Sequence, residues 1–209
     1  EKVTVTTDVF KATLNSTGGT LVRLELTKNA DTTDPTKPLV LFDDSAQRVY
    51  MAQTGLFSNQ PGVNLPTNMK VLPGERSLKD GSNEVSVAFE AASDSGLVVT
   101  KTYTFRRGDY SVGVRHELRN AGPAPVTPQL YLQLARDGKV DGNTSVFMGP
   151  TSYTGPAMYS EAGKFQKVEF TDLDKAKAEY EKAADNGWVA MIQHYFTSAW
   201  LVNAQAKRD

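Results

Sequence analysis

The first part of the chain alternates apolar and polar residues with a period of two. The alternation covers residues 2–6, continues over residues 10–14 and resumes over residues 21–26. This is the pattern of strands with one buried face. Between the second and third segments lie residues 15–19, Asn-Ser-Thr-Gly-Gly, and glycines permit the tight turn of a hairpin. The pattern therefore predicts antiparallel strands at the N-terminus.

The next part predicts short strands separated by loops. Residues 39–42 and 48–52 are apolar or β-branched runs typical of short strands. Residues 29–38 are rich in Asp, Thr and Pro, which favours a surface loop. Residues 58–74 are dense in Asn, Pro and Gly and are expected to form a long irregular connection that caps a sandwich.

The middle of the chain has the clearest pattern. Apolar residues alternate over residues 85–89, 97–106, 110–118 and 126–134, and turn residues separate these segments at 93–96, 107–109 and 120–122. Successive antiparallel strands joined by tight turns predict a meander. The 110–118 segment carries Tyr110, Val112, Val114, His116 and Leu118 on its expected inward face.

The C-terminal part mixes short strands with the one expected helix. Strands are expected at 146–148 and 165–170, and a loop at 150–156. A helix is expected over 172–184, with Thr171 as a possible N-cap and acidic residues in its first turn. Its apolar stripe is narrow and consists of Leu173, Ala176, Tyr180 and Ala183.

Residues 187–200 form the densest apolar and aromatic run and contain both tryptophans. Alternate positions place Trp188, Ala190 and Ile192 on one face and Val189 and Met191 on the other, so neither face is consistently polar. A strand with this pattern needs cover on both sides. A helix is the rival interpretation, but Gly187 and the β-branched and aromatic content favour a strand.

These elements predict an all-β fold of mainly antiparallel strands with a short C-terminal helical element. A chain of 209 residues is expected to form a single domain over 1–209. No apolar window approaches the ~18 residues of a membrane span, and the N-terminus lacks a signal-peptide pattern. The formal net charge is −1 and the basic residues are spread along the chain, which argues against a nucleic-acid partner.

Candidate chemistry is sparse. The chain has no cysteine, which excludes disulfides and thiolate catalysis. It has two histidines, and both His116 and His194 are expected to be structural. Their spacing fits no metal motif, and no cofactor-binding glycine loop is present, so no metal and no cofactor are expected. Residues 107–109, Arg-Gly-Asp, match an adhesion tripeptide but are expected to be a hairpin turn.

Three segments together resemble a known family. They are residues 3–9 followed by 15–19, residues 105–112 (Phe-Arg-Arg-Gly-Asp-Tyr-Ser-Val) and residues 187–200. In this order and spacing they are similar to the large periplasmic domain of YidC-type membrane protein insertases. The resemblance spans nearly the whole chain, and residues 187–200 are its most specific part. One departure is Asn186-Gly187, where the family pattern leads us to expect a pair of glycines.

The resemblance implies a galactose-mutarotase-like β-supersandwich on the periplasmic side of the bacterial inner membrane. It also implies a membrane helix before Glu1 and a bundle of membrane helices after Asp209. The implied role is an accessory, non-enzymatic one in the insertion and folding of inner-membrane proteins, alone or with the Sec translocon. The implied partners are accessory subunits of that translocon and, through the full-length protein, nascent inner-membrane proteins.

Candidate residues for partner binding or membrane proximity are Trp188, Tyr195, Phe196 and Trp200. Most of them are expected to pack in the core. Trp200, nearest the C-terminal exit, is the one expected to be exposed. The mutarotase-like fold leaves an alternative function, a sugar-binding or mutarotase-like enzyme that pairs His116 or His194 with a glutamate. Fold alone does not decide between the two functions.

Overall fold

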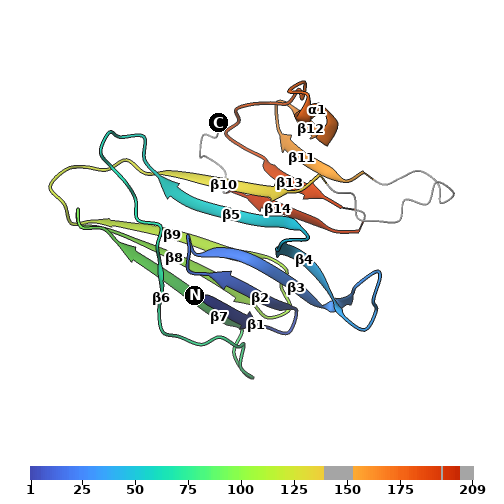
Figure 1. The fold of residues 1–209 in the computed structure, drawn as a ribbon, viewed down its shortest axis with the longest axis horizontal. Coiled ribbons are helices and arrows are strands. Elements are labelled where there is room, and N and C mark those ends of the chain that lie inside the picture. The colour runs from blue at the N-terminus through green and yellow to red at the C-terminus, as the bar shows by residue number, and fades with distance from the viewer. Residues whose placement is uncertain (139–152, 194, 203–209) are drawn as a thin grey trace. The chain divides into compact units, whose positions relative to one another are not determined.

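The computed structural model describes residues 1–138, 153–193 and 195–202 of the chain (Figure 1). The chain divides into two compact units, Glu1–Arg136 (unit 1) and Asp137–Asp209 (unit 2). Nearly all regular structure is β-strand, and every pairing between named strands is antiparallel. The prediction of an antiparallel all-β fold is therefore confirmed. The expectation that residues 1–209 form one domain stays a prediction.

Unit 1 contains ten strands. They are β1 (Lys2–Thr6), β2 (Phe10–Asn15), β3 (Thr20–Ala30), β4 (Pro38–Asp44), β5 (Val49–Phe57), β6 (Lys70–Val71), β7 (Glu84–Ala92), β8 (Leu97–Arg106), β9 (Val112–Asn120) and β10 (Gln129–Arg136). Six form one sheet in the order β1-β2-β3-β4-β5-β10, and four form a second sheet in the order β6-β7-β8-β9. The predicted N-terminal strands, their hairpin turn and the short strands after them are present.

The core of unit 1 lies where the buried faces of its two sheets meet. Strand β8 shows why the alternation was informative, because every second residue from Leu97 to Phe105 is buried. The rings of Phe105 and of Phe10 from β2 form an edge-to-face pair, with ring centroids 6.2 Å apart and an interplanar angle of 74°. Edge-to-face aromatic pairs of this kind add specific geometry to the burial of apolar area. Contacts of this type hold the two sheets together as a sandwich.

The predicted meander is correct for β7, β8 and β9 but wrong for the strand that follows. Strand β10 pairs with β5 of the six-stranded sheet and not with β9. The connection between them, residues 121–128, contains three prolines, which lack the N–H that a tight hairpin uses. The side chain of Gln60 accepts a hydrogen bond from Thr127 N and donates one to Pro125 O, which fixes this crossover.

The described residues of unit 2 form one sheet in the order β12-β11-β13-β14. Its strands are β11 (Gly155–Ser160), β12 (Lys164–Lys167), β13 (Trp188–Ile192) and β14 (Thr197–Leu201). The expected strand at 165–170 is thus shifted and shorter, and the expected loop at 150–156 ends where β11 begins at Gly155. The expected strand at 146–148 lies outside the described residues.

The aromatic run at 187–200 is a hairpin and not the single strand that the pattern predicted. Strands β13 and β14 pair with each other, and Gln193 N donates to Phe196 O at 2.7 Å to close the turn. Nor are both faces covered throughout, since Ala190 and Met191 are buried while Val189 is 42% exposed. The alternation with period two continues unchanged through the turn between these two apolar strands. The sequence pattern alone therefore could not reveal the turn.

The helix predicted over 172–184 is much shorter. Helix α1 spans Phe170–Asp174, and Glu169, not Thr171, is its N-cap residue. Ala176 has a positive φ of 51°, and the N–H groups of Ala176 and Lys177 donate to Leu173 O and Asp172 O. This is a Schellman motif, which ends a helix. The expected apolar stripe remains largely exposed, so no burial compensates for extending the helix.

Gly187 is the glycine on which unit 2 depends most. Its φ is +92°, and a Cβ atom there would lie 1.7 Å from Tyr159 O. We predict that Gly187→Ala destabilises unit 2 by at least about 3 kcal/mol, because the β11–β13 pairing must shift. Both tryptophans lie in unit 2, so tryptophan fluorescence during thermal unfolding reports on it.

The matched control is Gly62→Ala, which lies in unit 1, so its thermal unfolding is followed by circular dichroism and not by tryptophan fluorescence. Gly62 also has a positive φ, +76°, but its added Cβ would meet nothing within 4 Å. The control should cost only the left-handed strain of about 1 kcal/mol. Equal and small losses for both variants would show that Tyr159 and Gly187 are not in close contact.

Candidate functional site

The predicted aromatic residues lie on the β13–β14 hairpin of unit 2, and Trp188 is the centre of a cluster on its sheet. Its ring stacks on Tyr159 at a centroid distance of 6.1 Å with an interplanar angle of 19°. The ring of Phe165 lies 6.1 Å from Trp188 and is tilted by 48°. Trp188 is half-buried, which agrees with the expectation that most of these aromatics pack against other residues.

The other three predicted residues do not join this cluster. Trp200 pairs directly with Val189, the neighbour of Trp188, so the two tryptophans lie on opposite faces of the sheet. Trp200 and Phe196 are half-buried, whereas Tyr195 is 73% exposed. The expectation that Trp200 would be the exposed residue is wrong, because β14 is a paired strand and Tyr195 occupies the hairpin turn.

The strand register reveals an apolar row that the sequence did not. Tyr159 is paired with Phe165 on one side and Trp188 on the other, and Trp188 is paired with Leu201. The row therefore crosses all four strands on one face. Phe165 is 49% exposed and Leu201 is 74% exposed. The sequence analysis missed Tyr159, Phe165 and Leu201. They lie on separate strands, and only the pairing register shows which residues of those strands are neighbours.

Unit 1 contains the strongest concentration of buried polar groups, and Lys101 is its central residue. Lys101 occupies an inward position of β8 and is 1% exposed. Its ammonium donates to Gly18 O at 3.1 Å and to Thr54 O at 2.8 Å, and it lies 5.3 Å from the ring centroid of Tyr103. Burial lowers the pKa of Lys101 to about 7. No carboxylate of the described residues forms an ion pair with it.

Tyr103 completes the attachment of the β2–β3 turn. Its hydroxyl donates to Gly19 O at 2.7 Å, and burial raises the pKa of Tyr103. Gly19 has a φ of +53°, and a Cβ atom there would lie 3.2 Å from Lys101 Cδ and 3.1 Å from Met69 Sδ. The Gly-Gly turn is therefore required for two reasons: its backbone conformation, and the close approach of Lys101 from the opposite sheet and of Met69.

His116 is hydrogen bonded inside unit 1, as expected. Thr54 Oγ1 donates to Tyr131 O at 2.8 Å and lies 3.2 Å from His116 Nε2, so Nε2 carries the proton that the hydroxyl accepts. Burial and the nearby charge of Lys101 lower the pKa of His116 to about 4. Within the described residues, its Nδ1 has no hydrogen-bond partner. His116 is thus a neutral structural residue.

The geometry gives no support to a histidine–glutamate pair for sugar chemistry. Glu117 follows His116 on the strand but points outward, where it pairs with Arg115 at 2.6 Å. The two side chains therefore face different sides of the sheet and do not converge on one ligand. His194, the other histidine of that prediction, lies outside the described residues.

The Arg-Gly-Asp segment is a hairpin turn between β8 and β9, as predicted. Gly108 N donates to Asp8 Oδ2 at 2.9 Å and to Oδ1 at 3.1 Å. The Arg107 guanidinium donates to backbone oxygens of Lys79 and Ser82. Hydrogen bonds from Ser111 lower the pKa of Asp109. All three residues of the tripeptide therefore have structural contacts.

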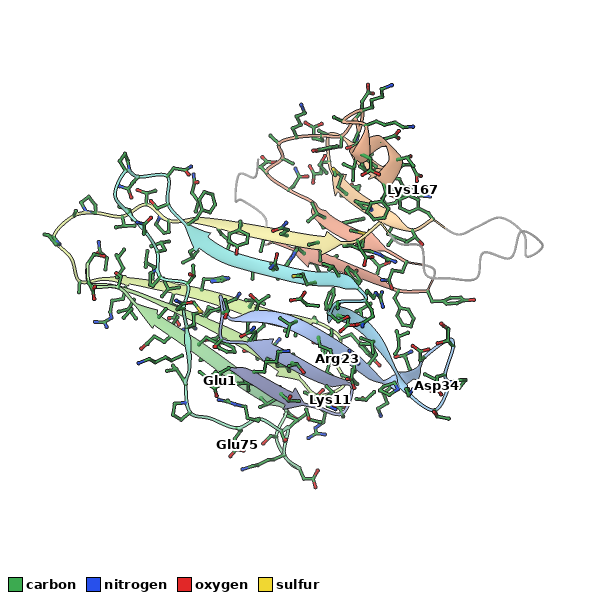
Figure 2. All side chains as sticks on the ribbon, in the orientation of Figure 1. Glu1, Lys11, Arg23, Asp34, Glu75 and Lys167 are labelled. Atoms are coloured by element: carbon green, nitrogen blue, oxygen red, sulfur yellow. The ribbon has the colours of Figure 1, made fainter. Side chains whose placement is uncertain are left out.

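Charged side chains on the outer face of the six-stranded sheet form a local network. Figure 2 labels Lys11 and Arg23, on the adjacent strands β2 and β3. The Arg23 guanidinium contacts Glu25 at 2.8 Å and Asp43 at 2.9 Å, and Lys11 lies 4.0 Å from Glu25. These cations already have carboxylate partners, so this face offers no cluster of free positive charge for a phosphate group.

Two further features concern metals and membranes. Among the described residues, no three His, Asp or Glu side chains come together as a metal ion would require. In the same part of the chain, no helix has the length and apolar character needed to cross a membrane.

Lys101 generates a pH-dependent prediction. The unfolded chain holds the Lys101 proton up to about pH 10.5, whereas the folded chain releases it near pH 7, so the free energy of unfolding should rise with pH between these values. The rise between pH 7 and pH 9 should be about 2 kcal/mol. Lys101→Met should lose this slope in denaturant unfolding followed by circular dichroism.

The control is Lys79→Met, which removes an exposed lysine and should keep the slope of the unmodified chain. If Lys101→Met retains the rise between pH 7 and pH 9, the slope comes from other groups and the assignment to Lys101 is wrong.

Comparisons with known proteins agree with the features above. The family model described as YidC periplasmic domain matches residues 2–209. A curated relative from Bordetella parapertussis, named membrane protein insertase YidC, is 48% identical over 211 residues, which covers 100% of this chain and 36% of the relative. Relatives of the same name from Burkholderia cenocepacia and Burkholderia thailandensis are 44% and 45% identical over 99% of the chain. The chain spans little more than a third of the length of these relatives. It belongs to the YidC periplasmic domain family.

Proposed function

We propose that this chain is an accessory interaction domain of a membrane protein insertase and not a catalytic centre. It would lie on the periplasmic side of the inner membrane, as part of a longer protein integral to that membrane. There it would assist the insertion and folding of inner-membrane proteins, alone or with accessory subunits of the Sec translocon. Nascent inner-membrane proteins would be its partners through the full-length protein.

The observation that carries this proposal is the match of residues 2–209 to the YidC periplasmic domain. The relatives named as insertases are almost three times as long as the part they share with this chain, at 36–37% coverage. Most of each relative therefore lies outside the shared part. We assign the insertion step itself to that remainder, and an interaction role to the chain described here.

The buried groups of unit 1 support a non-enzymatic role. Lys101 and Tyr103 are buried side chains that could transfer protons. Both instead donate hydrogen bonds to backbone carbonyls of the opposite sheet, and these bonds join the two sheets. His116 is bonded to Thr54 in the same region. Groups that hold a core together in this way are not arranged around a substrate.

Exposed apolar side chains on unit 2 support an interaction role. Tyr195 and Leu201 are each more than 70% exposed, and Phe165 is 49% exposed. Phe165 and Leu201 lie on one face of the sheet, whereas Tyr195 lies in the hairpin turn. Large exposed apolar residues are typical of contact sites for other proteins or membranes. We therefore keep Trp188, Tyr195, Phe196 and Trp200 as proposed contact residues.

The test replaces residues 1–209 by a flexible linker in the full-length protein, in cells depleted of their own insertase. Insertion of a model inner-membrane protein should continue, because the insertion step is assigned to the remainder of the protein. Co-purification of the accessory Sec subunits should fall about tenfold, as expected when an interface worth at least about 1.4 kcal/mol is lost. Protease accessibility measures insertion, and immunoblotting measures co-purification.

Two results would contradict the proposal. A complete loss of insertion, with the shortened protein still stably present in the membrane, would make the domain essential and not accessory. Polarimetry supplies the second test: acceleration of mutarotation of freshly dissolved galactose by the isolated chain would favour the sugar-active alternative.

A single substitution tests the contact residues. Tyr195→Ser should leave the melting temperature unchanged, since the side chain is 73% exposed, and should lower co-purification of the Sec subunits by a factor of about three. Tyr180→Ser, which alters another exposed tyrosine of unit 2, is the control and should have no effect. Equal effects of both substitutions would mean that Tyr195 is not part of a specific contact.

A further inference from the structure

The four-stranded sheet of unit 1 ends at β9, and the outer edge of this strand is open. Strand β9 has nine residues, and among the described strands it pairs with β8 alone. Just beyond it, Ala121 N donates to Gly96 O at 3.0 Å. In an antiparallel ladder, every second residue of a strand exchanges backbone hydrogen bonds with the same neighbouring strand. The bond at Ala121 therefore shows that the residues of β9 bonded to β8 are Gly113, Arg115, Glu117 and Arg119.

The alternate residues therefore present their backbone groups to the outside. These residues are Val112, Val114, His116 and Leu118. In the part of the chain that the structure describes, no hydrogen bond uses the N–H or C=O groups on this side of β9. A row of unpaired donors and acceptors at a sheet edge is a template for an additional strand.

Leucines of the other sheet lie over this edge. Thr54 of β5 reaches His116 of β9 and pairs in register with Leu132 of β10. Leu130 and Leu134 are two residues away from Leu132, so all three share the face that is turned toward β9. Leu130 is 50% exposed, and the other two are half-buried.

The inward-facing residues of β9 are also incompletely covered. Val114, His116 and Leu118 are all half-buried. The margin of the sandwich between β9 and β10 is therefore lined by mainly apolar side chains that are only partly buried. Apolar side chains of an additional strand would increase their burial.

The opposite face of β9 carries a charge pattern. Arg115, Glu117 and Arg119 point outward, and the side chains of Arg115 and Glu117 are 72% and 52% exposed. Charges directly opposite on neighbouring strands attract when they differ in sign and repel when they are alike. A strand added at this edge is thus favoured if it carries an acid opposite each arginine and a base opposite Glu117.

We propose that β9 binds an extended segment of another polypeptide as an additional antiparallel strand, whose apolar residues alternate with an acid, a base and an acid. This binding mode rests on the proposed interaction function and specifies the partner chemistry. Main-chain hydrogen bonds to β9 supply affinity, and the alternating side chains supply specificity.

A second copy of β9 fits this edge less well than a segment with the stated pattern. Antiparallel self-pairing about His116 would place Glu117 opposite Arg115 twice, but it would place Gly113 opposite Arg119. Self-pairing about Glu117 would place two glutamates together and each Arg115 opposite an Arg119, which is repulsive. The foreign segment places an opposite charge beside each of the three charged residues of β9, in addition to the existing contact between Arg115 and Glu117.

The test uses the whole 209-residue chain and a labelled peptide of about seven residues, in which valines alternate with Glu, Lys and Glu. The control peptide has the same composition of valines, with Lys, Glu and Lys at the charged positions. Fluorescence anisotropy should show binding of the first peptide and about tenfold weaker binding of the second. Amide hydrogen exchange should slow at Val112, Val114, His116 and Leu118.

Variants of β9 separate backbone pairing from side-chain contact. Val114→Pro removes one outward N–H and leaves the bonds to β8 in place, so it should weaken peptide binding much more than Val114→Ala, which keeps that N–H. The combined variant R115E, E117R and R119E should reverse the preference between the two peptides. Circular dichroism and the melting temperature check that each variant is folded.

Several results would overturn this inference. In the binding measurements, these are no binding by the folded chain, or equal binding of the two peptides. Among the variants, Val114→Pro and Val114→Ala would weaken binding equally. In the chain without peptide, the four amides would already be protected, or the chain would form a concentration-dependent dimer that the peptide does not displace. These results concern β9 alone. The proposed accessory role is tested separately, by the insertion and co-purification measurements in the full-length protein.

Discussion

A buried ammonium group joins the two sheets of unit 1. Lys101 extends from β8 into the core and donates to carbonyls of the β2–β3 turn and of β5, which both belong to the opposite sheet. A charge in this position is costly unless its donors are satisfied, so the two carbonyls must stay in place. The Gly-Gly turn, the position of β5 and the environment of His116 all depend on this arrangement. One lysine thus couples three segments that are far apart in the sequence.

Much of the fold could be predicted from the sequence because strands with one buried face have a clear period. Every second residue of β8 is buried, and the alternation of apolar residues made this strand evident. Lys101 itself is the exception to that pattern, and a polar residue at an inward position gave the only sequence signal of the buried cluster. Its partners are backbone carbonyls, which every residue has, so no motif could reveal them.

The failures have physical causes that a single sequence does not display. The helix ends because Ala176 adopts a left-handed backbone conformation, which cannot be predicted from an alanine in the sequence. Strand β10 joins the other sheet because the segment before it is too rich in proline for a tight turn. The pairing of Phe165, Tyr159, Trp188 and Leu201 in one row depends on strand register, which is a property of three separate strand pairs. Which aromatics share a surface therefore could not be read from their spacing.

The contact between Asp8 and Gly108 has a consequence for the order in which the chain can fold. The two residues are 100 positions apart, and the bonds from Lys101 and Tyr103 to the glycine turn span 83 and 84 positions. During synthesis, the N-terminal strands leave the ribosome long before these partner residues have been made. Forming contacts between residues so far apart in the sequence is slow. The apolar faces of the early strands therefore stay exposed until these contacts form. Until residue 108 has emerged, the first strands of this domain are vulnerable to aggregation and proteolysis.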